Sequence, residues 1–269
     1  SLGRVYWLKV YELQEGSRAA RGTPIINLIP LDIDNNEKIQ AVLAVRDFPE
    51  DKYILMVTRT GTVKKTPLKA YSRPRSSGIV AVDLRDGDEL VGVDITNGMQ
   101  DIMIFTNTGK SIRFSESKVR TTGRNAIGVK GIKLLEDAYV ISLVIADSGK
   151  VLTVTENGYG KCTMIDQYPQ KGRGGQGVIS IQTSERNGLV VGAVLVSEED
   201  DVMLISDQGT LVRTRVSEIS VTGRNTQGVR LSRLKKQEKL VGVEYIEAIE
   251  EEEGAADESS DEESAPDGE

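Results

Sequence analysis

The chain repeats a hairpin unit about every fifty residues. In each unit a polar turn ends in a glycine and leads into a short run that contains basic residues. A glycine between two strand-like runs is typical of a tight hairpin, because glycine accepts the positive φ that such turns need. The turn glycines are Gly3, Gly61, Gly109, Gly158 and Gly209. A hairpin unit repeated at a fixed period predicts an array of equivalent units, not one mixed core.

The units also continue in one order, starting near residues 1, 59, 107, 156 and 207. After the turn come a basic loop, ending at Gly22, Gly78, Gly128, Gly177 or Gly228, and a short alternating strand. An apolar strand follows, over 39–45, 90–93, 140–144, 189–194 and 240–243. The first four units add another, over 53–57, 101–105, 150–154 and 201–205. Four strands per unit predict an all-β, propeller-like ring or spiral whose neighbouring blades exchange strands.

The amino-acid usage excludes several kinds of site. The 269 residues contain no histidine, which excludes histidine acid–base catalysis and histidine metal ligands. The single cysteine, Cys162, excludes an internal disulfide and a cysteine zinc site and fits a reducing compartment. No apolar run reaches the 18 or so residues of a membrane span. We expect neither a bound metal nor a cofactor, and no membrane partner.

Charge is distributed unevenly along the chain. The net charge is −7, but residues 247–269 contain twelve acidic residues and no basic ones. Residues 1–246 therefore carry 34 basic against 29 acidic residues, a net charge of +5. We interpret 1–246 as a basic β domain and 247–269 as a disordered acidic tail, because the tail has too few large apolar side chains to form a core.

Arginines recur at one register of the basic loops. An arginine stands four residues before the final loop glycine in four of the five units, and in the second unit Arg73 and Arg75 flank that position. Equivalent loops of radial blades lie on one rim, so these arginines are expected to form a curved row. Such a row suits a polyanion with spaced phosphates, since arginine offers planar bidentate donors to phosphate oxygens. The alternative is a solvated rim whose arginines pair with local acids.

Basic residues in the strands after the turn glycines are expected to extend this row across the outer face of each blade, although exposed solubilising charges would give the same pattern. A polyanion bound through spaced phosphates is the partner that these residues predict. The residues predicted to bind it are Arg18, Arg21, Lys64, Lys65, Arg73, Arg75, Arg113, Arg124, Lys161, Lys171, Arg173, Arg213, Arg215 and Arg224.

Four runs of sequence resemble the C-terminal domain of the bacterial DNA gyrase A subunit. They lie within residues 4–30, 157–161, 185–194 and 209–220. The resemblance implies a β-pinwheel that wraps double-stranded DNA around a basic perimeter, so the predicted polyanion is DNA, bound at the residues named above through its phosphates with little sequence preference. It also implies a role in ATP-dependent negative supercoiling by an A2B2 holoenzyme with the gyrase B subunit, in the bacterial cytoplasm at the nucleoid. In that family catalysis resides outside this domain, so no reaction is expected of this chain itself.

One family feature is missing. The heptad Gln-Arg-Arg-Gly-Gly-Lys-Gly that marks the first blade in the gyrase family does not occur, and its nearest counterpart is 171–177 in the fourth unit. We therefore expect the chain to start after the blade that bears this heptad. The related C-terminal domain of topoisomerase IV is one alternative. A propeller-type scaffold for protein interactions is another, which salt-dependent DNA binding would distinguish.

Overall fold

The computed structural model describes residues 1–17 and 20–246. Within these ranges the secondary structure consists of short strands and single helical turns, and no helix is long and apolar enough to cross a membrane. The strands are β1 (Arg4–Val5), β2 (Tyr53–Thr58), β3 (Thr62–Pro67), β4 (Ile79–Val80), β5 (Leu90–Thr96), β6 (Asp101–Thr106), β7 (Lys110–Ser115), β8 (Val129–Lys130), β9 (Val140–Ala146), β10 (Lys150–Thr155), β11 (Tyr159–Met164), β12 (Val178–Ile179), β13 (Val190–Val196), β14 (Asp201–Ser206), β15 (Leu211–Arg215), β16 (Val229–Arg230) and β17 (Leu240–Ile246). The 3-10 turns are η1 (Val10–Glu12), η2 (Ile25–Asn27), η3 (Leu68–Tyr71), η4 (Glu116–Lys118), η5 (Ile165–Gln167) and η6 (Val216–Glu218).

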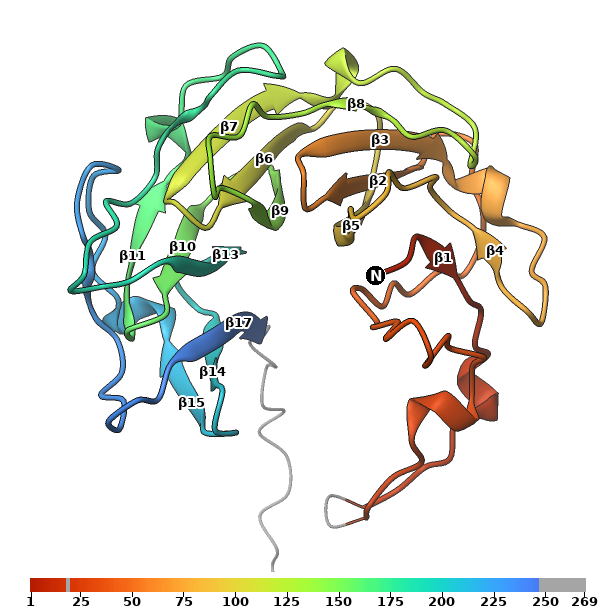
Figure 1. Cartoon of the computed structure of the whole chain (residues 1–269), viewed down its shortest axis with the longest axis horizontal. Coiled ribbons are helices and arrows are strands. Elements are labelled where there is room, and N and C mark those ends of the chain that lie inside the picture. The colour runs from red at the N-terminus through yellow and green to blue at the C-terminus, as the bar shows by residue number, and fades with distance from the viewer. Residues whose placement is uncertain (18–19, 247–269) are drawn as a thin grey trace, which may run out of the picture.

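The strands form antiparallel blades around an arc. Three blades have four strands, in the orders β5-β2-β3-β8, β9-β6-β7-β12 and β13-β10-β11-β16; a three-stranded sheet β15-β14-β17 and the pair β1-β4 complete the described part. Strands β5, β9, β13 and β17 lie on the inner side of the arc (Figure 1). The fourth strand of each four-stranded blade comes from the following repeat. The predicted all-β pinwheel with strand exchange is therefore confirmed.

The turn glycines are the points where the exchanged segments attach. The carbonyl oxygen of Gly109 accepts hydrogen bonds from the amides of Ser180 (2.8 Å) and Ile181 (3.2 Å), directly after β12. Gly109 has a φ of +78°, and a Cβ there would lie 2.2 Å from the Ile181 carbonyl oxygen, so a side chain does not fit. The same pair of bonds forms at Gly3, Gly61 and Gly158. The glycine period thus determines both the hairpins and the strand exchange.

The apolar core lies between successive blades. Leu55 and Val57 of β2 pack with Ile102 and Ile104 of β6 and Phe114 of β7 in one cluster, and all five are at most 1% exposed. Burying one side chain of this size contributes about 1.5–3 kcal/mol. Because each cluster needs residues from two blades, a blade is stabilised mainly by its neighbours, as in other repeat proteins.

The first repeat departs from the prediction. Residues 39–45 were expected to form an apolar strand, and the loop that ends at Gly22 was expected to lead into an alternating strand; neither strand forms, and Val42 is 88% exposed. In the other blades the inner strand pairs with the strand that precedes the turn glycine, as β5 pairs with β2. Within the described residues no strand pairs with 39–45, which therefore lacks the kind of partner that β5 has.

Candidate nucleic-acid interface

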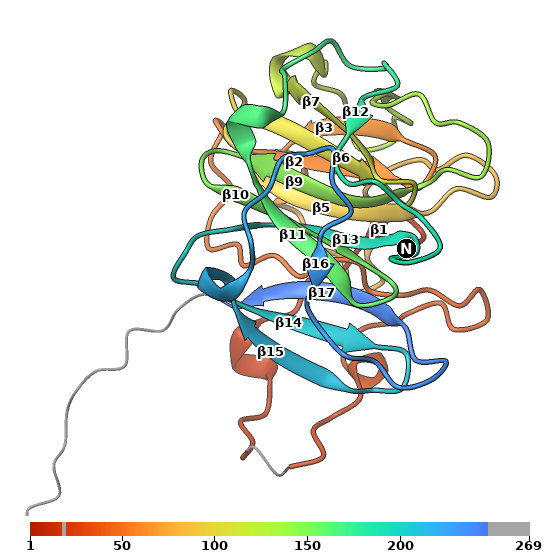
Figure 2. The ribbon, with the colours of Figure 1, turned by 90° about the vertical axis from the view of Figure 1, so that its left-hand side faces the viewer.

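Four loops carry six of the fourteen predicted basic residues. These rim loops (72–78, 119–128, 169–177 and 220–228) lead from the 3-10 turns to the exchanged strands β4, β8, β12 and β16. They run along the outer side of the arc (Figure 1), and Figure 2 shows β11 and β16 on the outer face of their blade. The expectation that equivalent loops share one rim is confirmed for these four loops.

Arg173 bridges two segments of the neighbouring repeat. Its Nε donates to the carbonyl oxygen of Lys118 (2.9 Å) and its Nη1 to that of Lys130 (3.1 Å). Lys118 closes η4 and Lys130 closes the exchanged strand β8. The arginine therefore holds its loop against the edge of the adjacent blade while remaining exposed.

Arg124, in the repeat before Arg173, and Arg224, in the repeat after it, make equivalent contacts. Nε of Arg224 donates to the carbonyl oxygen of Gln167 (2.5 Å) and Nη1 to that of Ile179, the last residue of β12 (2.8 Å). Nη1 of Arg124 donates to the carbonyl oxygen of Val80, the last residue of β4 (3.0 Å). In all three repeats Nη1 of the arginine binds the carbonyl oxygen of the last residue of the neighbouring exchanged strand. This shared contact explains why the arginines recur four residues before the final loop glycine.

Three lysines predicted for the outer face are buried, so that placement is wrong. Lys64 is 2% exposed, and its Nζ donates to Thr66 Oγ1 (2.7 Å) and the Ala81 carbonyl oxygen (2.8 Å). Burial, together with the positive charge of Arg124, lowers the pKa of Lys64 to about 8. The side chain lies beneath the exchanged segment, where it cannot reach a ligand outside the rim.

Lys161 and Lys65 are enclosed in the same way. Lys161 is 0% exposed and donates to the carbonyl oxygens of Gly223 (2.5 Å) and Arg224 (2.8 Å); burial, then Arg224, lowers its pKa to about 8. Lys65 is 5% exposed and lies 3.8 Å from the Glu116 carboxylate. Lys161 therefore anchors the rim loop 220–228 from beneath, and Lys65 is held against Glu116 of η4; neither extends the basic row.

Two strand arginines pair with acids across their hairpins. Arg113 Nε lies 2.9 Å from Asp101 Oδ2, and Arg213 Nη2 lies 2.5 Å from Asp201 Oδ2. Arg113 is partly buried, whereas Arg213 remains largely exposed. The remaining predicted residues with described positions are all exposed: Arg21, Arg73, Arg75, Lys171 and Arg215. Arg18 and the acidic tail 247–269 lie outside the described residues.

One basic position on the outermost strands lies outside the set predicted from the sequence. Lys130 and Arg230 both stand two residues after the final loop glycine, and both are exposed. Nη2 of Arg230 donates to the Tyr159 hydroxyl (2.8 Å), and the guanidinium of Arg186 lies over the same ring. The offset from Gly128 and Gly228 was visible in the sequence and could have revealed this position.

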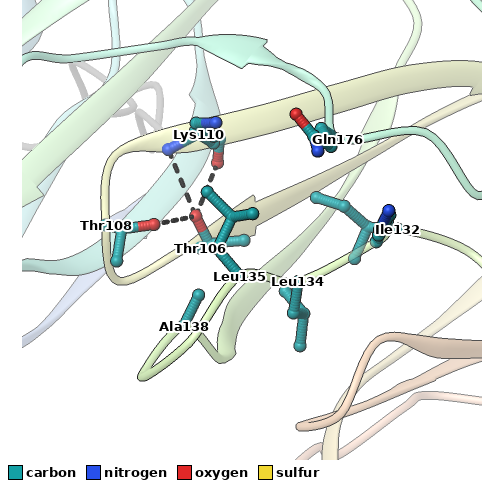
Figure 3. Close-up of a pocket in the computed structure, with 9 residues that line it drawn as sticks. Thr106, Thr108, Lys110, Ile132, Leu134, Leu135, Ala138 and Gln176 are labelled. Atoms are coloured by element: carbon teal, nitrogen blue, oxygen red, sulfur yellow. Dashed lines mark hydrogen bonds between the residues drawn. The ribbon is translucent and has the colours of Figure 1, made fainter.

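The pocket beside the β6–β7 turn is too small for a substrate. Its volume is about 10 Å³, enough for about one water molecule. Figure 3 shows that Thr106 hydrogen-bonds to Thr108 and Lys110 beside it. Within the described ranges, no three histidine, cysteine or acidic side chains form a group that could hold a metal ion.

The inner side of the arc is acidic. An open groove of about 550 Å³ lies between β5, β9, β13 and β17, and its charged lining residues are Asp94, Asp147, Asp200 and Glu244. Burial raises the pKa of Asp94, and the charge of Asp147 raises it further. Basic residues on the rim and acidic residues inside create opposite potentials on the two sides of each blade.

Comparison with known proteins decides the family. The model "DNA gyrase C-terminal domain, beta-propeller" matches residues 1–46, 52–97, 100–147, 149–197 and 200–247. The chain belongs to the DNA gyrase C-terminal domain family. As a member of this family it repeats the matched unit five times, and the suspected resemblance is confirmed.

Relatives and solved structures agree with this family. The DNA gyrase A subunit of Salmonella typhimurium is 55% identical over 275 residues, covering 100% of this chain and 31% of the relative. The Escherichia coli protein of the same name is 52% identical over 97% of this chain and 30% of its own length. The chain therefore spans about a third of these curated relatives.

Two solved domains share the fold. The C-terminal domain of DNA topoisomerase IV has a TM-score of 0.83 at 28% identity, with 91% of this chain and 76% of that one covered. The DNA gyrase A C-terminal domain has a TM-score of 0.78 at 26% identity, with 91% and 79% covered. The fold is therefore shared by the C-terminal domains of topoisomerase IV and of gyrase A. The curated sequence relatives named above are gyrase A subunits.

Proposed function

We propose that residues 1–246 bind double-stranded DNA along the rim and bend it, as the DNA-wrapping domain of a gyrase A subunit. In this proposal the chain works within an A2B2 holoenzyme with the gyrase B subunit, in the bacterial cytoplasm at the nucleoid. It contributes wrapping to ATP-dependent supercoiling, whereas DNA cleavage and ATP hydrolysis take place in other parts of that assembly. Family membership supports this role.

The observation that carries the proposal is the repeated arginine contact. Arg124, Arg173 and Arg224 take one register in successive rim loops and bind one strand position of the neighbouring repeat. A guanidinium has five N–H donors, and the contacts of Arg173 use two of them. The other three remain for a phosphate, on a side chain already held in place. Equivalent arginines spaced by one blade suit a backbone that runs across several blades.

The charge distribution supports binding outside the arc. The groove inside it is lined by Asp94, Asp147 and Glu244, which repel a polyanion. The exposed arginines lie on the opposite side of the blades. DNA on the rim must therefore curve around the protein, and bending a 20–30 bp site costs about 1–6 kcal/mol. Contacts from several blades are needed to offset that cost.

A ligation assay tests wrapping directly. Nicked circular DNA is incubated with the chain and sealed by ligase, and the topoisomers are separated after the protein is removed. Wrapping changes the linking number in one direction, and the gyrase family implies a positive change. The R124A R173A R224A variant is the matched control for the rim. A topoisomer distribution unchanged by the wild-type chain would contradict wrapping.

Salt dependence tests the kind of contact. About five to eight rim cations on phosphates predict a slope of log K against log salt of roughly −4 to −7. Phosphate contacts do not read base edges, so affinity should hardly change with sequence. A slope near zero, or a strong preference for one short sequence, would instead favour a protein-interaction scaffold.

A further inference from the structure

Two arginines converge on one tyrosine at the junction of two repeats. Tyr159 opens β11 and pairs with Arg230 of the exchanged strand β16. The Arg230 guanidinium carbon lies 5.3 Å from the centre of the tyrosine ring, and Nη2 donates to the hydroxyl at 2.8 Å. The guanidinium carbon of Arg186, from a different loop, lies 4.8 Å from the same ring centre. The cluster therefore forms only when β16 docks on β11.

The two positive charges have no acidic counterpart within the described residues. Neither Arg186 nor Arg230 belongs to any of the ion pairs found there within 4 Å. Both guanidinium groups are exposed, whereas Tyr159 is 5% exposed. The hydrogen bond from Arg230, then that from Arg186, holds the pKa of Tyr159 below its ordinary value. The two guanidinium groups thus make the potential at the hydroxyl positive.

The loop that presents Arg186 is itself held in place. Nδ2 of Asn157, in the β10–β11 turn, donates to the carbonyl oxygens of Glu185 (3.1 Å) and Arg186 (3.3 Å). Asn187, 0% exposed, donates to the carbonyl oxygen of Gln227 at the base of the rim loop 220–228. Main-chain contacts therefore position Arg186 and leave its side chain free to bind a ligand.

We infer that Arg186, Tyr159 and Arg230 bind a single phosphodiester group of DNA between the two guanidinium groups. The inference rests on the proposed DNA-wrapping function and deepens it by naming a site. Two guanidinium forks can each donate to phosphate oxygens, and the buried Tyr159 hydroxyl, which accepts from Arg230, orients that fork toward the same group. An anion there also relieves the repulsion between the two arginines. β11 and β16 lie on the outer face of their blade, along the path expected for the DNA (Figure 2).

A double-variant cycle tests whether the two arginines share one phosphate. The variants R186Q, R230Q and R186Q R230Q are compared with R233Q, which removes an equal charge at an exposed position three residues beyond Arg230. Each neutralised phosphate contributes about 0.9 to the slope of log K against log salt. We expect each single variant and the double variant to lose about 0.9, because all three lose the same phosphate. R233Q should keep the wild-type slope.

The outcomes separate this site from the proposed function. If the wild-type chain shows no salt-dependent DNA binding, the proposed function itself is overturned. If the wild type binds but R186Q matches R233Q, only this site is wrong. A loss of about 1.8 in the double variant, twice the single loss, would show independent contacts and overturn the shared phosphate. Circular dichroism and thermal unfolding check the folding of each variant; R186Q alone tests the site if R230Q is unfolded.

A second measurement observes the tyrosine directly. With ¹³C-labelled tyrosine, the Cζ resonance of Tyr159 is assigned by its absence in Y159F. A duplex of about 12 bp should shift this resonance in the wild type, and the shift should vanish in R186Q R230Q. Inorganic phosphate at matched ionic strength shows whether the shift requires a DNA phosphodiester or is also caused by a free anion. A full shift with phosphate alone would show a site for free anions and contradict a DNA phosphodiester site.

Discussion

Replacing Lys64 with methionine tests the claim that this lysine is structural and does not contact DNA. Its Nζ is buried and bonded to Thr66 and Ala81. Methionine has a similar length and no charge, and the Ala81 carbonyl oxygen keeps the hydrogen bond from the Tyr71 hydroxyl (3.2 Å). We therefore expect K64M to fold, to bind DNA with the wild-type salt slope, and to differ in how its stability depends on pH.

The size of the pH effect follows from the lowered pKa of Lys64. A folded-state value of about 8, against the ordinary 10.5, corresponds to about 3 kcal/mol at 1.36 kcal/mol per pH unit. Between these two values the unfolded chain binds the proton that the folded chain has lost, so the free energy of unfolding rises with pH. Below pH 8 both states are protonated and the contribution is constant. Methionine removes this rise.

Urea denaturation from about pH 7.5 to pH 10 measures the effect. The wild type should gain about 2–3 kcal/mol relative to K64M over this range. Ionisation of Tyr71, whose pKa burial raises to about 12, cancels in the difference. K236M, the same change at an exposed lysine, is the control and should follow the wild type. Parallel profiles for wild type and K64M, or a reduced DNA salt slope in K64M, would refute the reasoning.

Three further changes probe the blades, the rim and the tail. R124A R173A R224A should weaken binding to DNA of about 100 bp more than to a duplex of about 12 bp, because only long DNA must bend across several blades; equal losses in an electrophoretic mobility assay would argue against wrapping. G109A should lower the free energy of unfolding by about 1–3 kcal/mol or more. The φ of +78° at Gly109 disfavours any side chain, and the Ile181 carbonyl oxygen leaves no room for a Cβ. G123A, with open space around the site, should behave as wild type in the same urea titration. Deleting the tail 247–269 should tighten DNA binding at about 50 mM salt, since its twelve acids compete with DNA for rim cations such as Arg213 and Arg215, and the gain should shrink by about 300 mM; an undiminished gain would contradict this competition.

The fold could be predicted because the features that determine it are local and repeated. The turn glycines carry a positive φ, and four of the five, Gly109 among them, accept hydrogen bonds from the exchanged segment. Apolar runs such as 101–105 and 150–154 became strands because each packs against the next blade. The run 39–45 has similar residues and forms no strand, because a strand requires a partner that local sequence does not reveal.

The buried lysines show where reasoning from charge alone fails. The third residue after the turn glycine is lysine at Lys64 and Lys161, and isoleucine or valine at Ile112 and Val212. Ile112 is 1% exposed, and the lysines occupy the same enclosed position. Apolar residues at two of these four positions were a sign of burial, which comparison across repeats could have detected. The contacts of Arg173 with main-chain carbonyl oxygens could not be predicted from the sequence, because they depend on how the exchanged strand docks on the neighbouring blade.

In the proposed function, the rim arginines link the shape of the arc to its affinity for DNA. Arg173 and Arg224 each hold two carbonyl oxygens of the adjacent repeat, so their guanidinium groups are oriented before any ligand arrives. A free arginine loses up to about 2 kcal/mol of rotamer entropy when it is fixed on a phosphate. An arginine already fixed by the fold loses less on binding, which leaves more of the contact energy to offset DNA bending. Substituting lysine would keep the positive charge but would remove the planar guanidinium, whose N–H groups can donate to the carbonyl oxygens and to a phosphate at the same time. R173K should therefore retain the salt slope of binding short duplexes and still reduce the linking-number change, whereas equal losses in both assays would mean that only the charge matters.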